Sequence, residues 1–207
     1  CRVYKQSDSN KRQCIRYIFV ALLLLDEAVK VVGLGVQGLY GPQYLPFHLC
    51  SINIFVILWH SKRPNRALDN YLFTVGIPAA MIALLTPSWA VLPFWNFMNI
   101  HSFTVHILLA TYPIMLTYSG ELNPQIKYLP KSLAVLAALA CVAYGVNLIF
   151  DTNFMFLMYP IAGTPLVWFE EHMGNHFWGF PILITAIVAV MYSGLYLYRK
   201  IANKRLT

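Results

Sequence analysis

Residues 131–150, KSLAVLAALACVAYGVNLIF, carry a single charge, Lys131, at the first position. A helix of about 20 apolar residues matches the roughly 30 Å hydrocarbon core of a bilayer. Five other stretches are similarly apolar, so the sequence predicts six membrane spans: 14–37, 46–61, 69–87, 95–118, 131–150 and 177–198. Only 11% of the 207 residues are charged, against about 25% in soluble domains. We therefore expect an all-α polytopic membrane protein in which residues 1–207 form a single transmembrane helical domain.

The net charge of +7 comes from Lys and Arg residues on one side of this predicted zigzag. Fourteen of the 15 lie in alternate segments between spans: Arg2, Lys5, Lys11, Arg12, Arg16, Lys62, Arg63, Arg66, Lys127, Lys131, Arg199, Lys200, Lys204 and Arg205. The connections 38–45, 88–94 and 151–176 contain no Lys or Arg. Since cytoplasmic loops are enriched in these residues, we predict a cell-membrane protein with both ends of this chain in the cytoplasm. The same distribution argues against a nucleic-acid partner.

Polar side chains within the predicted spans gather in the outer half of the bilayer. They are Asp26, Glu27, Lys30, His48, Cys50, Asn53, His101, His106 and Asn147, with Asp151 and Asn153 just beyond the fifth span. Charged groups inside a bilayer are costly and usually face the bundle interior or a wet cavity. The sequence therefore predicts a polar site that faces the outer leaflet.

Cys50 is the candidate nucleophile of this site. We expect its helix to begin at Pro46, and a nearby helix N-terminus together with a base would activate the thiol. A regular helix points His48 away from the Cys50 face, so a base must come from another span. His106 lies at a depth similar to that of Cys50, whereas His101 is nearer the headgroups. A structural role remains an alternative for each residue, because a membrane Cys often packs as a small apolar group.

The charged triad Asp26, Glu27 and Lys30 has two interpretations. Lys30 is spaced i,i+4 from Asp26 and i,i+3 from Glu27, so an ion pair within one helix is one explanation. A polar headgroup site is the other. No CxxC or HExxH spacing, Walker loop, GxSxG elbow or dinucleotide fingerprint occurs, and we predict neither a metal nor a cofactor. The long connection 151–176 is predicted to form a lid, a re-entrant element or a structural cap.

Three stretches carry a family resemblance: LPFHLCSINIF (45–55), LPFWNFMNIHSFTVHILLATYPIML (92–116) and VNLIFDTNFMFL (146–157). They resemble the YwaF family of bacterial integral membrane proteins, which is related to vertebrate transmembrane protein 164. The resemblance implies one further amino-terminal span, which gives seven in the full-length protein. It also implies the chemistry of the vertebrate relative, which is regarded as an acyltransferase that remodels ether phospholipids. More distant relatives look like membrane hydrolases with a Thr–His pair.

The resemblance also assigns roles to particular residues. Cys50 of the HLC element matches the presumed nucleophile, and His106 matches its partner, with His101 as the alternative. The residues Asn147, Asp151 and Asn153 fall in an NxxxDTNF-like element of the family.

We therefore expect a lipid acyltransferase or transacylase, or a lipid ester hydrolase, in which Cys50 attacks a glycerolipid ester and His106 acts as the base. Its partners would be membrane phospholipids or lysolipids. The substrate-binding candidates are Glu27, Lys30, Asn53, His101, Asn147, Asp151 and Asn153, and the supporting candidates are Asp26 and His48. The alternative from another class is a small-solute transporter or receptor that uses the same outer polar pocket. A structural subunit of a larger complex is a third.

Overall fold

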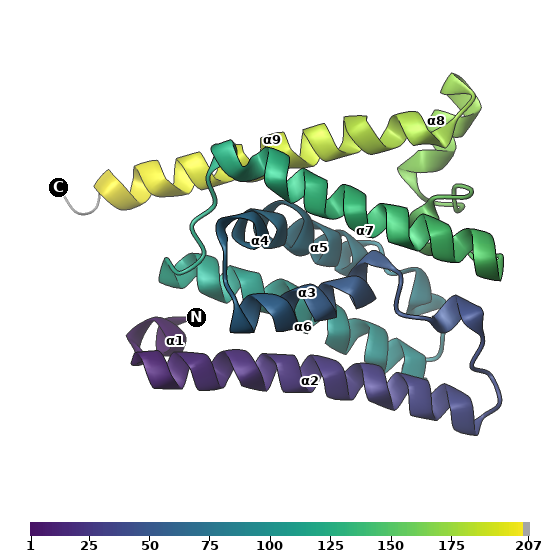
Figure 1. The fold of residues 1–207 in the computed structure, drawn as a ribbon, viewed down its shortest axis with the longest axis horizontal. Coiled ribbons are helices and arrows are strands. Elements are labelled where there is room, and N and C mark those ends of the chain that lie inside the picture. The colour runs from purple at the N-terminus through teal and green to yellow at the C-terminus, as the bar shows by residue number, and fades with distance from the viewer. Residues whose placement is uncertain (205–207) are drawn as a thin grey trace. The chain divides into compact units, whose positions relative to one another are not determined.

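The computed structural model describes residues 1–204, which form helices joined by turns and contain no β-strand (Figure 1). Arg205, one of the basic residues at the C-terminal end, lies outside the described residues. The chain packs as two compact units, which divide after Met155. Unit 1 comprises residues 1–155, and unit 2 begins at Phe156.

Unit 1 contains most of the helices. They are α1 (Arg2–Gln6), α2 (Ser9–Val36), α3 (Leu49–Lys62), α4 (Arg66–Tyr71), α5 (Ile77–Leu85), α6 (Phe97–Ser119) and α7 (Leu129–Phe150), with the 3-10 turns η1 (Pro42–Tyr44), η3 (Ser88–Val91) and η4 (Ile126–Tyr128). The short turn η5 (Phe154–Phe156) contains the point at which the chain passes from unit 1 to unit 2. Unit 2 contains α8 (Pro165–Met173), η6 (His176–Trp178) and α9 (Gly179–Lys204).

Four helical segments of the described chain are long and apolar enough to cross a membrane. They are Arg66–Leu85, Phe97–Ser119, Ile126–Phe150 and His176–Ile201. The all-helical membrane fold predicted from the sequence is confirmed at this level. Two of the six predicted spans do not meet both criteria: α3 has only 14 residues, whereas α2 has 28 residues but carries charged side chains in its body.

The start of α3 differs from the sequence prediction. Pro46 lies in a turn before the helix, and His48, in extended conformation, is the N-cap. The first helical hydrogen bond runs from the Ile52 N–H to the His48 carbonyl. The expected start at Pro46 is therefore wrong, and Cys50 is the second residue of α3 rather than one turn inside it.

A π-helical stretch, η2 (Leu72–Gly76), joins α4 to α5 into one continuous helical segment. Pro78 follows as the second residue of α5. Proline has no N–H and its ring clashes with the preceding turn, and widening the turn to π geometry accommodates both effects. The wide turn is fully packed, because Leu72, Phe73 and Gly76 are all buried.

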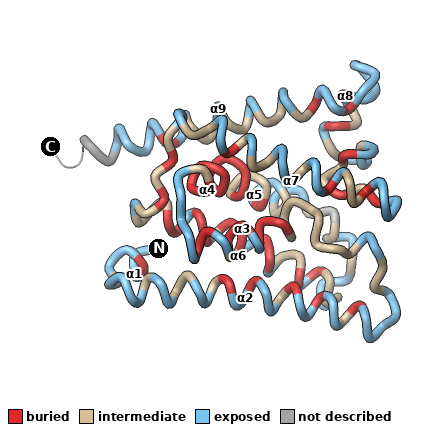
Figure 2. The backbone as a smooth tube through the Cα atoms, in the orientation of Figure 1, coloured by how far each residue is buried: buried red, intermediate tan, exposed pale blue. Residues whose placement is uncertain are grey.

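The core of unit 1 lies among α2 to α6. Its largest fully buried side chains include Leu23, Ile54, Tyr71, Leu109 and Tyr112. Figure 2 shows buried positions concentrated on α3, α4 and α6. By contrast, α7 exposes large apolar side chains such as Ile149. An apolar helix surface of this kind is stable against lipid but not against water.

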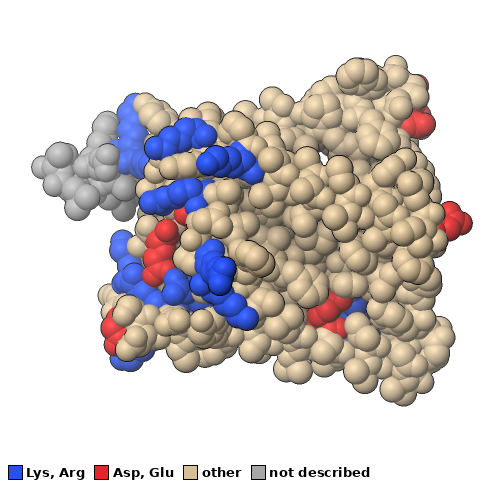
Figure 3. Space-filling model, in the orientation of Figure 1, with Lys and Arg blue, Asp and Glu red and all other residues tan. Residues whose placement is uncertain are grey.

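Basic side chains gather at the end of unit 1 that holds the N-terminus (Figure 3). We call this the basic end. There Glu121, just after α6, pairs with Arg12 at 3.1 Å and with Arg16 at 2.9 Å, and also accepts a hydrogen bond from the Tyr4 hydroxyl at 2.8 Å. These contacts join α1 and α2 to the end of α6. At the N-terminus of α4, Arg66 lies 3.5 Å from Asp69.

Candidate active site

The structure brings Cys50 on α3 and His106 on α6 into direct contact. The Cys50 Sγ lies 3.0 Å from the His106 Nε2, although the two residues are 56 positions apart in sequence. His106 is buried and Cys50 is half-buried. The pair lies well away from the basic end, since Cys50 precedes the end of α3 by 12 residues, or about 18 Å of helix. A thiol and an imidazole at hydrogen-bond distance are the elements of a nucleophile and its base.

The second nitrogen of His106 fixes which proton the ring carries. Nδ1 lies 2.6 Å from the backbone carbonyl of Ser102, one turn earlier in α6. A carbonyl oxygen can only accept, so Nδ1 must hold the proton and the neutral ring keeps Nε2 unprotonated. Nε2 is therefore free to accept the thiol proton of Cys50. The Ser102 carbonyl has the orienting role that a carboxylate plays in a three-residue arrangement.

Asn53 lies one turn after Cys50 on α3 and is fully buried. Its Oδ1 accepts a hydrogen bond of 2.8 Å from the hydroxyl of Tyr71 on α4. Tyr71 is close enough to Cys50 to interact with it electrostatically. Sequence reasoning did not identify Tyr71, because nothing local distinguishes it from other membrane tyrosines. The contact fixes the Cys50 face of α3 against α4.

Three charged residues of α2, Asp26, Glu27 and Lys30, take part in two pairs beside this site. Lys30 Nζ lies 2.5 Å from Glu27 Oε1, and both side chains are buried. Asp26, the acid without that cation, instead lies against α6, with its Oδ2 2.8 Å from His101 Nδ1. These two atoms are close but poorly aligned for a hydrogen bond, and Glu27 Oε2 also has no hydrogen-bond partner. Asp26 and His101 lie within electrostatic range of His106.

His48 packs at the start of α3. Its ring lies edge-on to Phe154, with centroids 5.0 Å apart, and Phe47 contacts the same ring at 5.7 Å. Lys30 is within electrostatic range of His48. His48 therefore packs the start of α3 against the turn after α7.

Asn147 organises the turn that presents Phe154. Its Oδ1 accepts hydrogen bonds from the Thr152 hydroxyl at 2.9 Å and the Phe154 N–H at 2.7 Å. Its Nδ2 donates to the Phe154 carbonyl at 3.1 Å. The side chain is fully buried and all of these contacts lie within its own turn. Asn147 thus holds the backbone of the turn whose Phe154 ring packs on His48. These three hydrogen bonds of its side chain are all to Thr152 and Phe154.

The other two residues of the DTNF element occupy the same turn. Asp151 is the C-cap of α7, exposed and in the left-handed conformation with φ 50°, whereas Asn153 is half-buried. Left-handed backbone at a non-glycine residue is costly and persists where its surroundings hold it. The Asn147 hydrogen bonds supply that constraint here.

A further buried histidine, His60, was not identified as a candidate from the sequence. His60, near the C-terminal end of α3, lies 3.0 Å from the Tyr112 hydroxyl through Nδ1 and 3.0 Å from Asp69 Oδ1 through Nε2. Both ring nitrogens are used, and the three side chains are buried. This network differs from the Cys50–His106 pair because it leaves no ring nitrogen for a substrate. It joins α3, α4 and α6 near the basic end.

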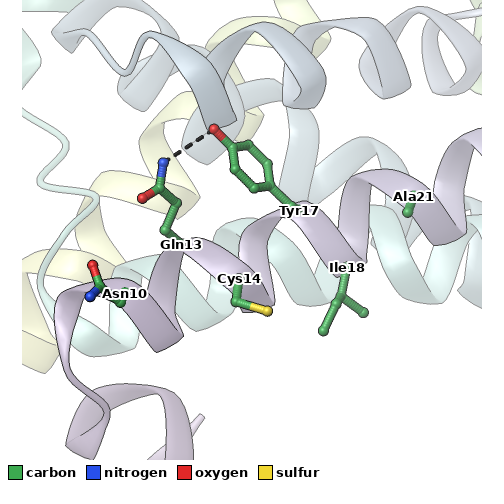
Figure 4. Close-up of a pocket in the computed structure, with 6 residues that line it drawn as sticks. All are labelled: Asn10, Gln13, Cys14, Tyr17, Ile18 and Ala21. Atoms are coloured by element: carbon green, nitrogen blue, oxygen red, sulfur yellow. Dashed lines mark hydrogen bonds between the residues drawn. The ribbon is translucent and has the colours of Figure 1, made fainter.

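The surface of α2 carries a shallow hollow at some distance along the helix from the charged pairs (Figure 4). All six lining residues belong to α2: Asn10, Gln13, Cys14, Tyr17, Ile18 and Ala21. The only polar contact drawn there is the hydrogen bond from Gln13 to the Tyr17 hydroxyl at 3.2 Å. Cys14 is exposed and no base adjoins it among these residues, so the hollow offers no chemistry comparable to Cys50.

No group of three His, Cys, Asp or Glu side chains within residues 1–204 is arranged to hold a metal ion. The four cysteines are all free.

Comparison with protein families identifies the chain. The TMEM164 family model matches residues 1–194. The chain belongs to the TMEM164 family. This agrees with the resemblance carried by the HLC, FTVH and DTNF elements, all of which fall within the matched residues. No curated protein and no solved structure matches the chain significantly.

Proposed function

We propose that this member of the TMEM164 family is a membrane lipid acyltransferase in which Cys50 is the nucleophile and His106 the general acid and base. The observation that carries the proposal is the 3.0 Å contact between Cys50 Sγ and His106 Nε2, together with the Ser102 contact at Nδ1. That combination gives an unprotonated nitrogen aimed at a thiol in an apolar helical protein, where a lipid ester is the most available electrophile.

In the first half-reaction, Cys50 Sγ attacks the carbonyl carbon of a glycerolipid ester while His106 Nε2 takes the thiol proton. The ester carbonyl becomes a tetrahedral oxyanion. When this intermediate collapses, the C–O bond to the glycerol breaks and His106 returns the proton to the leaving oxygen. The products are an acyl thioester on Cys50 and a lysolipid.

In the second half-reaction, the hydroxyl of an acceptor lysolipid attacks the thioester and His106 removes its proton. The new ester forms as the thiolate leaves, and the same proton restores the Cys50 thiol. Water in place of the lysolipid gives a free fatty acid, so hydrolysis shares the first half-reaction. The half-exposed position of Cys50 and the apolar surroundings support transfer between lipids within the bilayer.

Two features of the site would assist charge development. The first-turn N–H groups of α3 have no partners within the helix and lie at its positive end, beside Cys50. On the α2 side, the Glu27–Lys30 and Asp26–His101 pairs would contact the phosphate and glycerol of a bound lipid. Glu27 Oε2 is buried and has no hydrogen-bond partner. It could accept a hydrogen bond from the hydroxyl of the acceptor lysolipid. Asp151 and Asn153 are proposed to border the headgroup, and Asn53 to hold the nucleophile face.

The charge distribution supports a topology of six spans in this chain, with α2 and α3 included and the basic end in the cytoplasm. In that arrangement Cys50 and His106 face the outer leaflet. The charged pairs mean that α2 is not a purely apolar helix. They do not prevent α2 from spanning the membrane, because paired charges within a helix bundle are tolerated. The family resemblance supports a seventh span in the full-length protein.

The experiment uses membranes or detergent-purified protein supplied with a phospholipid carrying a labelled acyl chain and an unlabelled lysolipid. Replacing Cys50 with Ala is expected to abolish transfer and the labelled thioester. Replacing His106 with Ala is expected to slow transfer by about 10²- to 10⁴-fold, the usual effect of losing a general base.

Two matched variants control for indirect effects. Cys141→Ala removes an exposed cysteine and should leave transfer unchanged. His60→Ala removes a buried histidine outside the site and tests whether any histidine loss is damaging through folding alone. Wild-type rates in both the Cys50 and the His106 variants would rule out the assignment.

A further inference from the structure

Trp89, in the η3 turn between α5 and α6, contacts the base of the proposed pair. Tryptophans near the ends of apolar segments, such as Trp89, Trp95, Trp168 and Trp178 here, usually serve as interfacial anchors. In the structure its ring instead stacks on His106, with centroids 4.7 Å apart and planes inclined by 13°. The ring also meets Phe103 edge-on at 5.7 Å. Trp89 therefore covers one face of the imidazole that contacts Cys50.

The indole N–H of Trp89 is buried and has no hydrogen-bond acceptor. Leaving a buried donor unpaired costs about 1–3 kcal/mol, and such groups are rare enough in native proteins that each needs an explanation. An indole nitrogen is a donor only, so the missing partner is an oxygen or another acceptor. Trp95 is 83% exposed, so its indole N–H does not carry the cost of a buried, unpaired donor.

We infer that Trp89 is a further catalytic residue, whose indole N–H donates to the carbonyl oxygen of the bound acyl ester and to the oxyanion that replaces it. The inference rests on the proposed function, because it assigns the N–H to the intermediate formed at Cys50. The ring face orients His106, and the edge supplies the donor. The N–H proton stays on the indole throughout, so proton transfer remains between Cys50, His106 and the leaving oxygen.

With this assignment, the hydrogen-bond donors to the oxyanion come from two separate elements of the fold. The first-turn N–H groups of α3 lie on the side of the nucleophile, and the Trp89 N–H comes from the η3 turn on the side of the base. Hydrogen-bond donors fixed before the reaction stabilise developing charge strongly in a site from which water is excluded. Asn147, whose amide is occupied within its own turn, is not needed for this role.

Trp89→Phe is the decisive variant because it keeps an aromatic face for His106 and removes only the N–H edge. We expect the single-turnover rate of Cys50 thioester formation to fall about 10²- to 10³-fold, the effect of losing one oxyanion donor. The concentration of donor lipid that gives half the maximal rate should change little, because the hydrogen bond from Trp89 strengthens only in the transition state. Trp95→Phe is the matched control and should acylate at the wild-type rate.

A second reaction separates donation from positioning. Iodoacetamide alkylates a thiol without forming an oxyanion, so a protein in which the exposed Cys1, Cys14 and Cys141 are Ser reports alkylation of Cys50 alone. In that background Trp89→Phe should alkylate at the wild-type rate while its acylation is slow. Equal slowing of both reactions, or acylation within twofold of wild type, overturns the donor assignment. Absence of a thioester in the unmodified protein would overturn the proposed function instead.

Discussion

Asn147→Ala should destabilise unit 1 through the turn that follows α7. The substitution removes three buried hydrogen bonds: two accepted from Thr152 and Phe154 and one donated to the Phe154 carbonyl. Each is worth about 0.5–1.5 kcal/mol in soluble proteins, and interhelical side-chain bonds in membranes average about 0.6 kcal/mol. The expected loss in the free energy of unfolding is therefore about 2–4 kcal/mol. Thr152→Val removes one of the three bonds and should cost roughly a third as much.

The assay is equilibrium unfolding of the purified protein in mixed micelles, followed by fluorescence, with Asn10→Ala on the exposed face of α2 as the neutral control. A loss below about 0.5 kcal/mol for Asn147→Ala, or a larger loss for Thr152→Val, would refute the hydrogen-bond reasoning. Cys50 acylation is then measured well below the melting temperature of each variant. If folded Asn147→Ala lost acylation by 10²-fold or more, Asn147 would be the oxyanion donor, since one such donor is worth about that factor, and the structural assignment would be wrong.

Two further predictions concern charges. Lys30→Met leaves the buried Glu27 carboxylate unpaired and should lower the free energy of unfolding by about 3–5 kcal/mol. Adding Glu27→Gln to Lys30→Met should recover most of this loss. Equal stability of the single and double variants would contradict an ion pair between Glu27 and Lys30. Burial and the neighbouring Glu121 carboxylate raise the pKa of Tyr4 above its usual value of about 10, so the neutral phenol stabilises the fold below pH 10 and that contribution is lost as the pH rises further. Melting temperatures between pH 8 and 11 should fall more steeply for the wild type than for Tyr4→Phe; parallel curves would refute this.

The sequence identified the polar side chains of the site and predicted the Cys50–His106 pair, but it did not predict most of their other partners. Cys50 and His106 were selected because hydropathy sets the depth of each span, and depth is a local property of each helix. The start of α3 was misplaced by three residues because Pro46 favours a helix start but also a turn, and the extended His48 N-cap resolves that choice. The spacing of Asp26, Glu27 and Lys30 predicted an ion pair within one helix but did not say which acid pairs with Lys30, and only the packing of α2 against α6 shows that Asp26 meets His101.

Trp89 and Tyr71 show why the other contacts of the site could not be predicted from the sequence. A tryptophan after an apolar span is typical of the membrane interface, and only the path of the η3 turn places its ring on His106. Tyr71 reaches Asn53 because α4 packs against α3. Neither contact leaves a periodic signal in the sequence.

The amino-acid sequence by itself identified a helical membrane protein, and it predicted the depth of the polar residues in the bilayer. These follow from apolar run lengths and charge placement, because every backbone polar group in a bilayer must be paired within its own helix. The tertiary structure alone decided which nitrogen meets the thiol, which proton that ring carries and which indole covers it. Those depend on the rotation of α3 and α6 about their axes, which is set by side-chain packing between residues distant in sequence.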